Sequence, residues 1–274
     1  MSKENGLSGL INLGNTCYIN SVIQILSHTH ELKNSIKNIS IHSCIDNTLF
    51  KEWLSLDKLM WHKNCVIKPN KFLTAIHSLA NHYKNDYFNG FDQNDASEFI
   101  IFLFNSFHNS CKTSVDMKIK GNPSNEIDKL AIECYKSFVR QHQNDYSIII
   151  KLFYSIQITY NIKTIDDKTL SYSCQSNFII NVPVSKNTND LYDCFDEYIK
   201  DEELNGENGV IDEKDNIKYD VVQKTKFWNL PNILIICFKR FSFDGTRKEN
   251  KIIDFPIKDL DLSKYILGYH KNSH

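Results

Sequence analysis

The chain has 274 residues, of which 41% are hydrophobic, so it is long enough to bury a large core without disulfides or structural metals. Its formal net charge of -1 gives no overall basic field that would attract nucleic acid or an anionic membrane. No apolar run reaches the roughly 18 residues that span a bilayer, and the N-terminus lacks the pattern of a signal peptide. The eight scattered cysteines include no C-x-x-C pair, which favours a reducing compartment, the cytoplasm or the nucleus.

The first half of the chain predicts helices. After Cys17, apolar residues recur at helical spacing from Ile19 to Leu26. The same periodicity predicts three more helices, at about 49–61, 71–82 and 93–107. Residues 112–127 are polar and poorly periodic, so we expect a loop there.

The second half favours strands. β-Branched and aromatic residues predict strands within 147–162 and 174–184. A short amphipathic helix is predicted from Leu191 to Ile199, after the cap-type residues Asn189 and Asp190. The apolar run 230–241 predicts a strand that is buried on both faces.

Helices followed mainly by strands indicate an α+β protein. We expect one catalytic domain, with a helical part at 1–145 and a β-rich part at 146–274.

Cys17 stands where a glycine-containing turn meets the first predicted helix. Asn15 and Thr16 are favourable N-cap residues, which places Cys17 in the first helical turn. The positive end of a helix dipole favours a thiolate over a thiol. Asn12 can present its amide N–H groups to a developing oxyanion. A buried packing thiol is the alternative for an isolated cysteine, but the flanking sequence favours a nucleophile.

The sequence GLINLGNTCYINSVIQIL at 9–26 resembles the cysteine box of the ubiquitin-specific proteases, which are papain-like cysteine hydrolases. The resemblance places the nucleophile at Cys17 and the oxyanion-hole asparagine at Asn12. It implies a papain-like fold with a helical thumb, β-rich fingers and a palm, of which residues 146–274 supply the fingers and an incomplete palm. The implied reaction is hydrolysis of the bond after the C-terminal glycine of ubiquitin, through a thioester on Cys17.

Two further segments extend the resemblance. Residues 90–99, GFDQNDASEF, are similar to the family's QQDAxEF segment, whose acidic residues contact the basic tail of ubiquitin. The substrate-binding candidates there are Gln93, Asp95 and Glu98; without the resemblance, the two acids suit a helix N-terminus. Residues 230–241 resemble the LPxxLxxxLKRF strand, which adds Phe241 as a substrate-binding candidate. The family's FPxxLDLS segment is matched by FP at 255–256 and LDLS at 260–263.

The sequence departs from the family at the zinc site that many members carry at the tip of the fingers. The ligands there are two C-x-x-C pairs, and the corresponding positions are roughly 164–167 and 212–215. Neither segment supplies a thiolate or an imidazole. The acidic stretch 193–215 lacks the spaced oxygen ligands of a calcium loop. We expect no zinc, no other metal and no cofactor.

The catalytic histidine is the second departure. The family's histidine lies in a GHYxAY strand after the LDLS segment, whereas His270 and His274 follow it here without that motif. The acid or amide that orients the histidine is not recognised either. We therefore expect that these residues are a fragment of a longer chain. The resemblance implies ubiquitin or its conjugates as the partner, and we expect the protein to be a monomer. A ubiquitin-binding module without turnover and a protease for a ubiquitin-like modifier are the alternatives.

Overall fold

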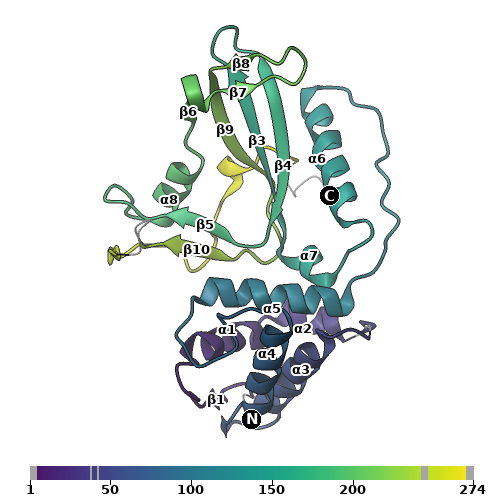
Figure 1. Ribbon diagram of the computed structural model, residues 1–274, viewed down its shortest axis with the longest axis vertical. Coiled ribbons are helices and arrows are strands. Elements are labelled where there is room, and N and C mark those ends of the chain that lie inside the picture. Colours follow the sequence, from purple (N-terminus) through teal and green to yellow (C-terminus); the bar gives the residue numbers. More distant parts are fainter. Residues whose placement is uncertain (1–4, 38, 42, 242–245, 270–274) are drawn as a thin grey trace. The chain divides into compact units, whose positions relative to one another are not determined.

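The computed structural model describes residues 5–37, 39–41, 43–241 and 246–269 (Figure 1). The chain divides into two compact units. The helical unit comprises Met1–Ser114 with Asp145–Leu152, and the β-rich unit comprises Val115–Asn144 with Phe153–His274. The mixture of helices and strands confirms the α+β class.

The helical unit is built around α5. Its elements are β1 (Gly9–Leu10), α1 (Cys17–Ser27), α2 (His30–Ile36), α3 (Asn47–His62), β2 (Val66–Ile67), α4 (Asn70–His82), α5 (Ala96–Cys111) and the start of α7 (Ile148–Phe153). The two short strands pair in parallel. Phe107 of α5 lies with its ring centroid 4.8 Å from those of Phe50 and Trp53 on α3. All three side chains are buried, so aromatic packing between α3 and α5 forms the centre of this unit.

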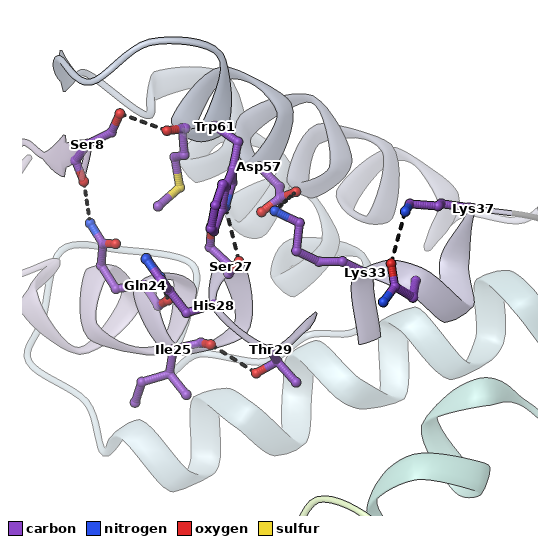
Figure 2. A network of polar contacts seen from close by, with 12 residues as sticks. Ser8, Gln24, Ile25, Ser27, His28, Thr29, Lys33, Lys37, Asp57 and Trp61 are labelled. Carbon is purple, nitrogen blue, oxygen red and sulfur yellow. Dashed lines mark hydrogen bonds and ion pairs between the residues drawn. The ribbon is translucent and has the colours of Figure 1, made fainter. Parts of the chain in front are cut away.

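Polar contacts around Trp61 fix α1 and α2 to α3 (Figure 2). The Trp61 indole N–H donates to both the carbonyl oxygen and the hydroxyl of Ser27, at 3.1 and 2.8 Å. Lys33 of α2 lies over the indole ring at 3.8 Å and pairs with Asp57 at 3.2 Å. Trp61 of α3 therefore contacts both the last residue of α1, which begins at Cys17, and Lys33 of α2.

The β-rich unit contains a four-stranded antiparallel sheet in the order β4-β3-β9-β6. Its strands are β3 (Ser155–Lys163), β4 (Thr169–Asn177), β6 (Glu202–Leu204) and β9 (Val221–Asn229). Two smaller sheets join β5 (Ile180–Pro183) to β10 (Ile236–Lys239) and β7 (Val210–Ile211) to β8 (Lys218–Tyr219). The helices of this unit are α6 (Glu126–His142) and α8 (Leu191–Tyr198), with short 3₁₀ turns at Gly206–Asn208 and Ser263–Tyr265.

Two hydrophobic clusters hold this unit together. In the first, Phe195 of α8 packs with Phe227 of β9 and Tyr265, and all three side chains are buried. In the second, α6 covers the sheet through Ala131 and Cys134, which contact Ile156, Ile158 and Trp228. The predicted helix at Leu191 is confirmed, with Asp190 as its N-cap, accepting from the backbone N–H of Asp193.

Two predicted strands differ from the structure. Residues 148–153 form helix α7, in which Ile149, Ile150, Leu152 and Phe153 are all buried. This short run is apolar at every position except Lys151, and its pattern does not distinguish a buried helix from a buried strand. In the run 230–241 only Ile236–Lys239 form a strand, and its residues are half-buried or exposed, so the expectation of a strand buried on both faces is wrong.

The division of the chain also differs from a single boundary at residue 145. Residues 126–142, for which no separate element was predicted, form α6 and pack on the sheet, whereas 145–152 return to the helical unit. The N-terminus of α6 carries a recognisable signal, because Asn125 caps it through the backbone N–H of Asp128.

We predict that Gly268→Ala destabilises the β-rich unit by about 1–3 kcal/mol through overpacking. A methyl group at Gly268 would fall on the backbone carbonyl of Trp228 and within 3.1 Å of its indole ring. Chemical denaturation measures the loss. Gly90→Ala is the matched control, because a methyl group there meets no atom within 4 Å; equal stability of the two variants would contradict the prediction.

Candidate active site

The side chain of Asn12 organises the turn before α1. Its Oδ1 atom accepts from the backbone N–H of Gly14 at 3.1 Å and of Thr16 at 3.0 Å, and from the Thr16 hydroxyl at 3.1 Å. An amide has one acceptor end and one donor end. The oxygen end of this exposed side chain is therefore engaged by the turn.

The turn uses backbone conformations that favour its particular residues. Gly14 has φ of 104° and Asn15 has φ of 52°, both in the left-handed region where glycine and asparagine are best tolerated. The Asn15 side chain donates to the carbonyl of Phe91 at 2.9 Å. The turn is thereby joined to the segment that precedes α5.

Cys17 is the first residue of α1, and its thiol is exposed. Thr16 occupies the N-cap position, but its hydroxyl bonds to the preceding turn and leaves the helix N–H groups uncapped. Farther along α1, Asn20 donates to the carbonyls of Leu10 and Ile11 at 3.3 and 3.2 Å. The predicted position of Cys17 in the first helical turn is confirmed.

The N-termini of α1 and α5 lie side by side. The Tyr18 ring meets Phe99 of α5 edge-on, with centroids 5.5 Å apart, and the Asn94 side chain donates to the Tyr18 hydroxyl at 3.4 Å. Burial raises the pKa of Tyr18 above its usual value, so the hydroxyl stays protonated. The fold therefore brings together the two segments that the sequence marked, 9–26 and 90–99.

Asp95 is the N-cap of α5. Its Oδ1 atom accepts from the backbone N–H of Ser97 at 2.7 Å and of Glu98 at 3.3 Å, and from the Ser97 hydroxyl. Burial works against ionisation, but these hydrogen bonds prevail and hold the pKa of Asp95 below its ordinary value. Gln93 and Glu98 are exposed beside it.

These three residues line one end of a hollow of about 900 Å³ in the helical unit. Aromatic walls come from Tyr87, Phe88 and Phe102, and Asp46 lies with Tyr83 at another part of the lining. The Tyr83 hydroxyl donates to Asp46 at 2.8 Å, and burial followed by this bond raises the pKa of Tyr83 to about 12. The lining holds three carboxylates and, within the described part of the chain, no lysine or arginine. Such a surface suits a basic polypeptide segment.

Phe241 lies in the β-rich unit, whereas Cys17, Asn12, Gln93, Asp95 and Glu98 all lie in the helical unit. Phe241 is 60% exposed, and its backbone forms an isolated antiparallel β-bridge with Lys248. The Lys248 ammonium lies 5.6 Å from the centroid of the Phe241 ring. The structure therefore brings five of the six candidate residues into one unit and leaves the role of Phe241 a prediction.

The histidines of the described segments include several with structural contacts. His28 bonds through Nδ1 to the Gln24 carbonyl at 2.9 Å, and His108 bonds through Nδ1 to the Ser147 hydroxyl at 2.8 Å. His270 and His274 lie outside the described residues.

The fingertip positions considered for zinc are occupied by a polar cluster. Lys163 pairs with Asp212 at 3.0 Å, and its ammonium lies 3.5 Å from the centroid of the Tyr219 ring. The Tyr219 hydroxyl donates to Asp215 at 2.7 Å. No group of three or more potential metal ligands occurs among the residues that the structure describes. The expected lack of zinc stays a prediction.

A family model described as ubiquitin carboxyl-terminal hydrolase matches residues 8–274. The chain belongs to this family. It is 28% identical over 279 residues to ubiquitin carboxyl-terminal hydrolase Usp2 of Drosophila melanogaster, covering 99% of this chain and 29% of the relative. It is 28% identical over 277 residues to human ubiquitin carboxyl-terminal hydrolase 2, covering 95% of this chain and 44% of the relative. The chain thus spans less than half the length of either relative.

The fold is also similar to a solved structure. The SAGA DUB module Ubp8/Sgf11/Sus1/Sgf73 bound to monoubiquitin matches 97% of this chain and 56% of the solved chain, with a TM-score of 0.69 and 19% identity. This confirms the ubiquitin-specific protease fold. Among the described helices, none is long and apolar enough to cross a membrane.

We predict that Asp95→Ala destabilises the protein by about 1 kcal/mol, because it removes the N-cap of α5. Asp95→Asn retains an acceptor and should cost less. The folded-state pKa of Asp95 is lowered, so its stabilisation is present above the ordinary carboxyl pKa of about 4 and is lost as the pH falls through the folded-state pKa. Urea denaturation at neutral and acidic pH should show the gap between wild type and Asp95→Ala narrowing in acid; a gap that widens there would contradict the assignment.

Proposed function

We propose that this chain is a deubiquitinating thiol protease whose nucleophile is Cys17. The observation that carries the proposal is the turn before α1, in which the Asn12 side-chain oxygen is held by the backbone and the Cys17 thiol is exposed at the start of the helix. Membership of the ubiquitin carboxyl-terminal hydrolase family supports the reaction.

In the proposed reaction, the Cys17 sulfur attacks the carbonyl carbon of the C-terminal glycine of ubiquitin. The carbonyl oxygen becomes an oxyanion, and the Asn12 amide N–H stabilises it by donating a hydrogen bond. The tetrahedral intermediate collapses to a thioester as the amine leaves with a proton, and water then releases ubiquitin. Protonation of the amine needs a general acid, which in thiol proteases is a histidine.

The hollow beside α5 supports binding of a basic tail. Glu98 is exposed in the first turn of α5 and has no part in capping that helix, so its carboxylate is the first choice for a substrate arginine. Gln93 can add a neutral hydrogen bond. Asp95 contributes its charge, because Oδ1 is already engaged by the helix N-terminus. The SAGA DUB module with the similar fold is bound to monoubiquitin, which supports ubiquitin as the partner.

A ubiquitin-binding module without turnover is the second candidate function. It is favoured only by the sequence, in which the family's histidine motif is not recognised. A protease for a ubiquitin-like modifier would use the same chemistry on a different partner. We further propose that the protein is a monomer. A location in the cytoplasm or nucleus is supported by the cysteines of the chain, which are free thiols.

We predict that a ubiquitin bearing a C-terminal electrophile labels Cys17, measured on the full natural polypeptide by peptide mass spectrometry. Cys17→Ser should abolish both labelling and hydrolysis of a ubiquitin C-terminal amide, with little change in stability, because the side chain is exposed. Saturable ubiquitin binding without any labelling would favour the binding module. Selective labelling by a ubiquitin-like electrophile would favour the third alternative.

We predict that Asn12→Asp folds normally yet lowers kcat by about 10²–10³, because the aspartate retains the acceptor of the turn and removes the oxyanion donor. Asn12→Ala should lose kcat and also some stability, since it leaves three donors without their acceptor. Steady-state kinetics and thermal melting separate the two effects. An Asn12→Asp variant with unchanged kcat would remove Asn12 from the oxyanion site.

A further inference from the structure

Two cysteines far apart in the sequence meet inside the β-rich unit. Cys134 lies on α6 and Cys174 on β4, and their sulfur atoms are 2.9 Å apart. Both are free thiols. The side chain of Cys134 is completely buried, whereas that of Cys174 is half-buried. Neither residue takes part in the proposed reaction of Cys17.

The surrounding contacts keep the two thiols next to each other. Cys134 belongs to the cluster that α6 forms with Ile156, Ile158 and Trp228. One turn farther along the same helix, the Ser137 hydroxyl donates to the backbone carbonyl of Cys174 at 3.3 Å. On the strand side, Cys174 pairs with Ile158 of β3 in the antiparallel sheet. The proximity of the thiols is therefore built into the attachment of α6 to the sheet.

We propose that Cys134 and Cys174 are a modification site at which a peroxide forms a reversible disulfide between α6 and β4. This inference does not rest on the proposed hydrolase function. The two sulfur atoms are within hydrogen-bonding distance, and either thiol can donate to the other. Cys174 is the more accessible of the two thiols, which makes it the entry point for an oxidant.

The reaction has two steps. The Cys174 thiolate attacks one oxygen of hydrogen peroxide, which breaks the O–O bond and gives a sulfenic acid and, after protonation of the released hydroxide, one water. The Cys134 sulfur then attacks the sulfenic sulfur, forms the S–S bond and expels the hydroxyl as a second water. Two thiols and one peroxide are thereby converted to one disulfide and two waters. Dithiothreitol reverses the change by thiol–disulfide exchange.

The disulfide would join an edge strand of the sheet to the helix that covers it. It would close a loop that contains the segment between α6 and β4. Because this loop lowers the conformational entropy of the unfolded chain, the disulfide stabilises the folded state relative to the unfolded one. The β-rich unit should therefore be more stable after oxidation than before, and this gain should be reversible.

The experiment treats the full natural polypeptide with stoichiometric hydrogen peroxide, blocks remaining thiols with iodoacetamide and maps cross-links by peptide mass spectrometry. We use the Cys17→Ser background so that oxidation of the proposed nucleophile does not contribute. The expected result is a peptide pair that joins Cys134 to Cys174, a rise in melting temperature of roughly 5–10 °C and reversal of both by dithiothreitol.

Cys174→Ser removes the entry point and should abolish the cross-link and the rise in melting temperature. Cys237→Ser is the matched control, because Cys237 is a half-buried cysteine of the same unit on β10, and it should leave both intact. Complete alkylation of Cys134 and Cys174 after peroxide treatment, or a rise in melting temperature that survives Cys174→Ser, would overturn the proposal.

Discussion

The side-chain oxygen of Asn12 accepts three hydrogen bonds from the turn that follows it, and the site in the helical unit depends on this one acceptor. A turn with two successive positive φ values has few internal backbone bonds of its own, so a side chain must satisfy its N–H groups. Satisfying them fixes the rotamer of Asn12. The same constraint sets where α1 begins and therefore where the Cys17 thiol lies. The structural role of Asn12 thus uses only the oxygen end of its amide.

The two adjoining helix N-termini divide their electrostatic roles differently. At α5, Asp95 satisfies the first N–H groups, so that end is capped by a carboxylate of the chain itself. At α1, the Thr16 side chain makes no cap bond, and the first turn carries no acidic residue. The positive end of α1 therefore remains available to the sulfur at Cys17 or to an anion that forms beside it. A carboxylate cap at α1, like the one at α5, would take up these N–H groups.

The local backbone structure around Cys17 was more predictable from sequence than the boundaries and contacts of the elements around it. Gly14, Asn15 and the residues around Cys17 act through local turn and helix geometry, which short-range patterns encode. The helix at 93–107 in fact begins at Ala96, because Asp95 adopts the extended conformation of an N-cap. Residues 148–153 were misassigned because burial removed their periodicity. The contact between Tyr18 and Asn94 and the meeting of Cys134 with Cys174 join distant segments, and no local signal in one sequence specifies such pairs.

The tip of the β-rich unit shows how a small hairpin is held together by contacts that are weak individually. The pair of β7 and β8 is only two residues long on each strand, and such a hairpin is marginal alone. The Lys163–Asp212 pair is about 15% and 13% exposed, so it is less screened than a surface ion pair, and the Tyr219 ring adds a second contact for the same ammonium. Because all of these contacts converge on Lys163, they form a cooperative unit. The tip should therefore open as one piece and at a lower free energy than the sheet core around Phe227, which is held by aromatic packing.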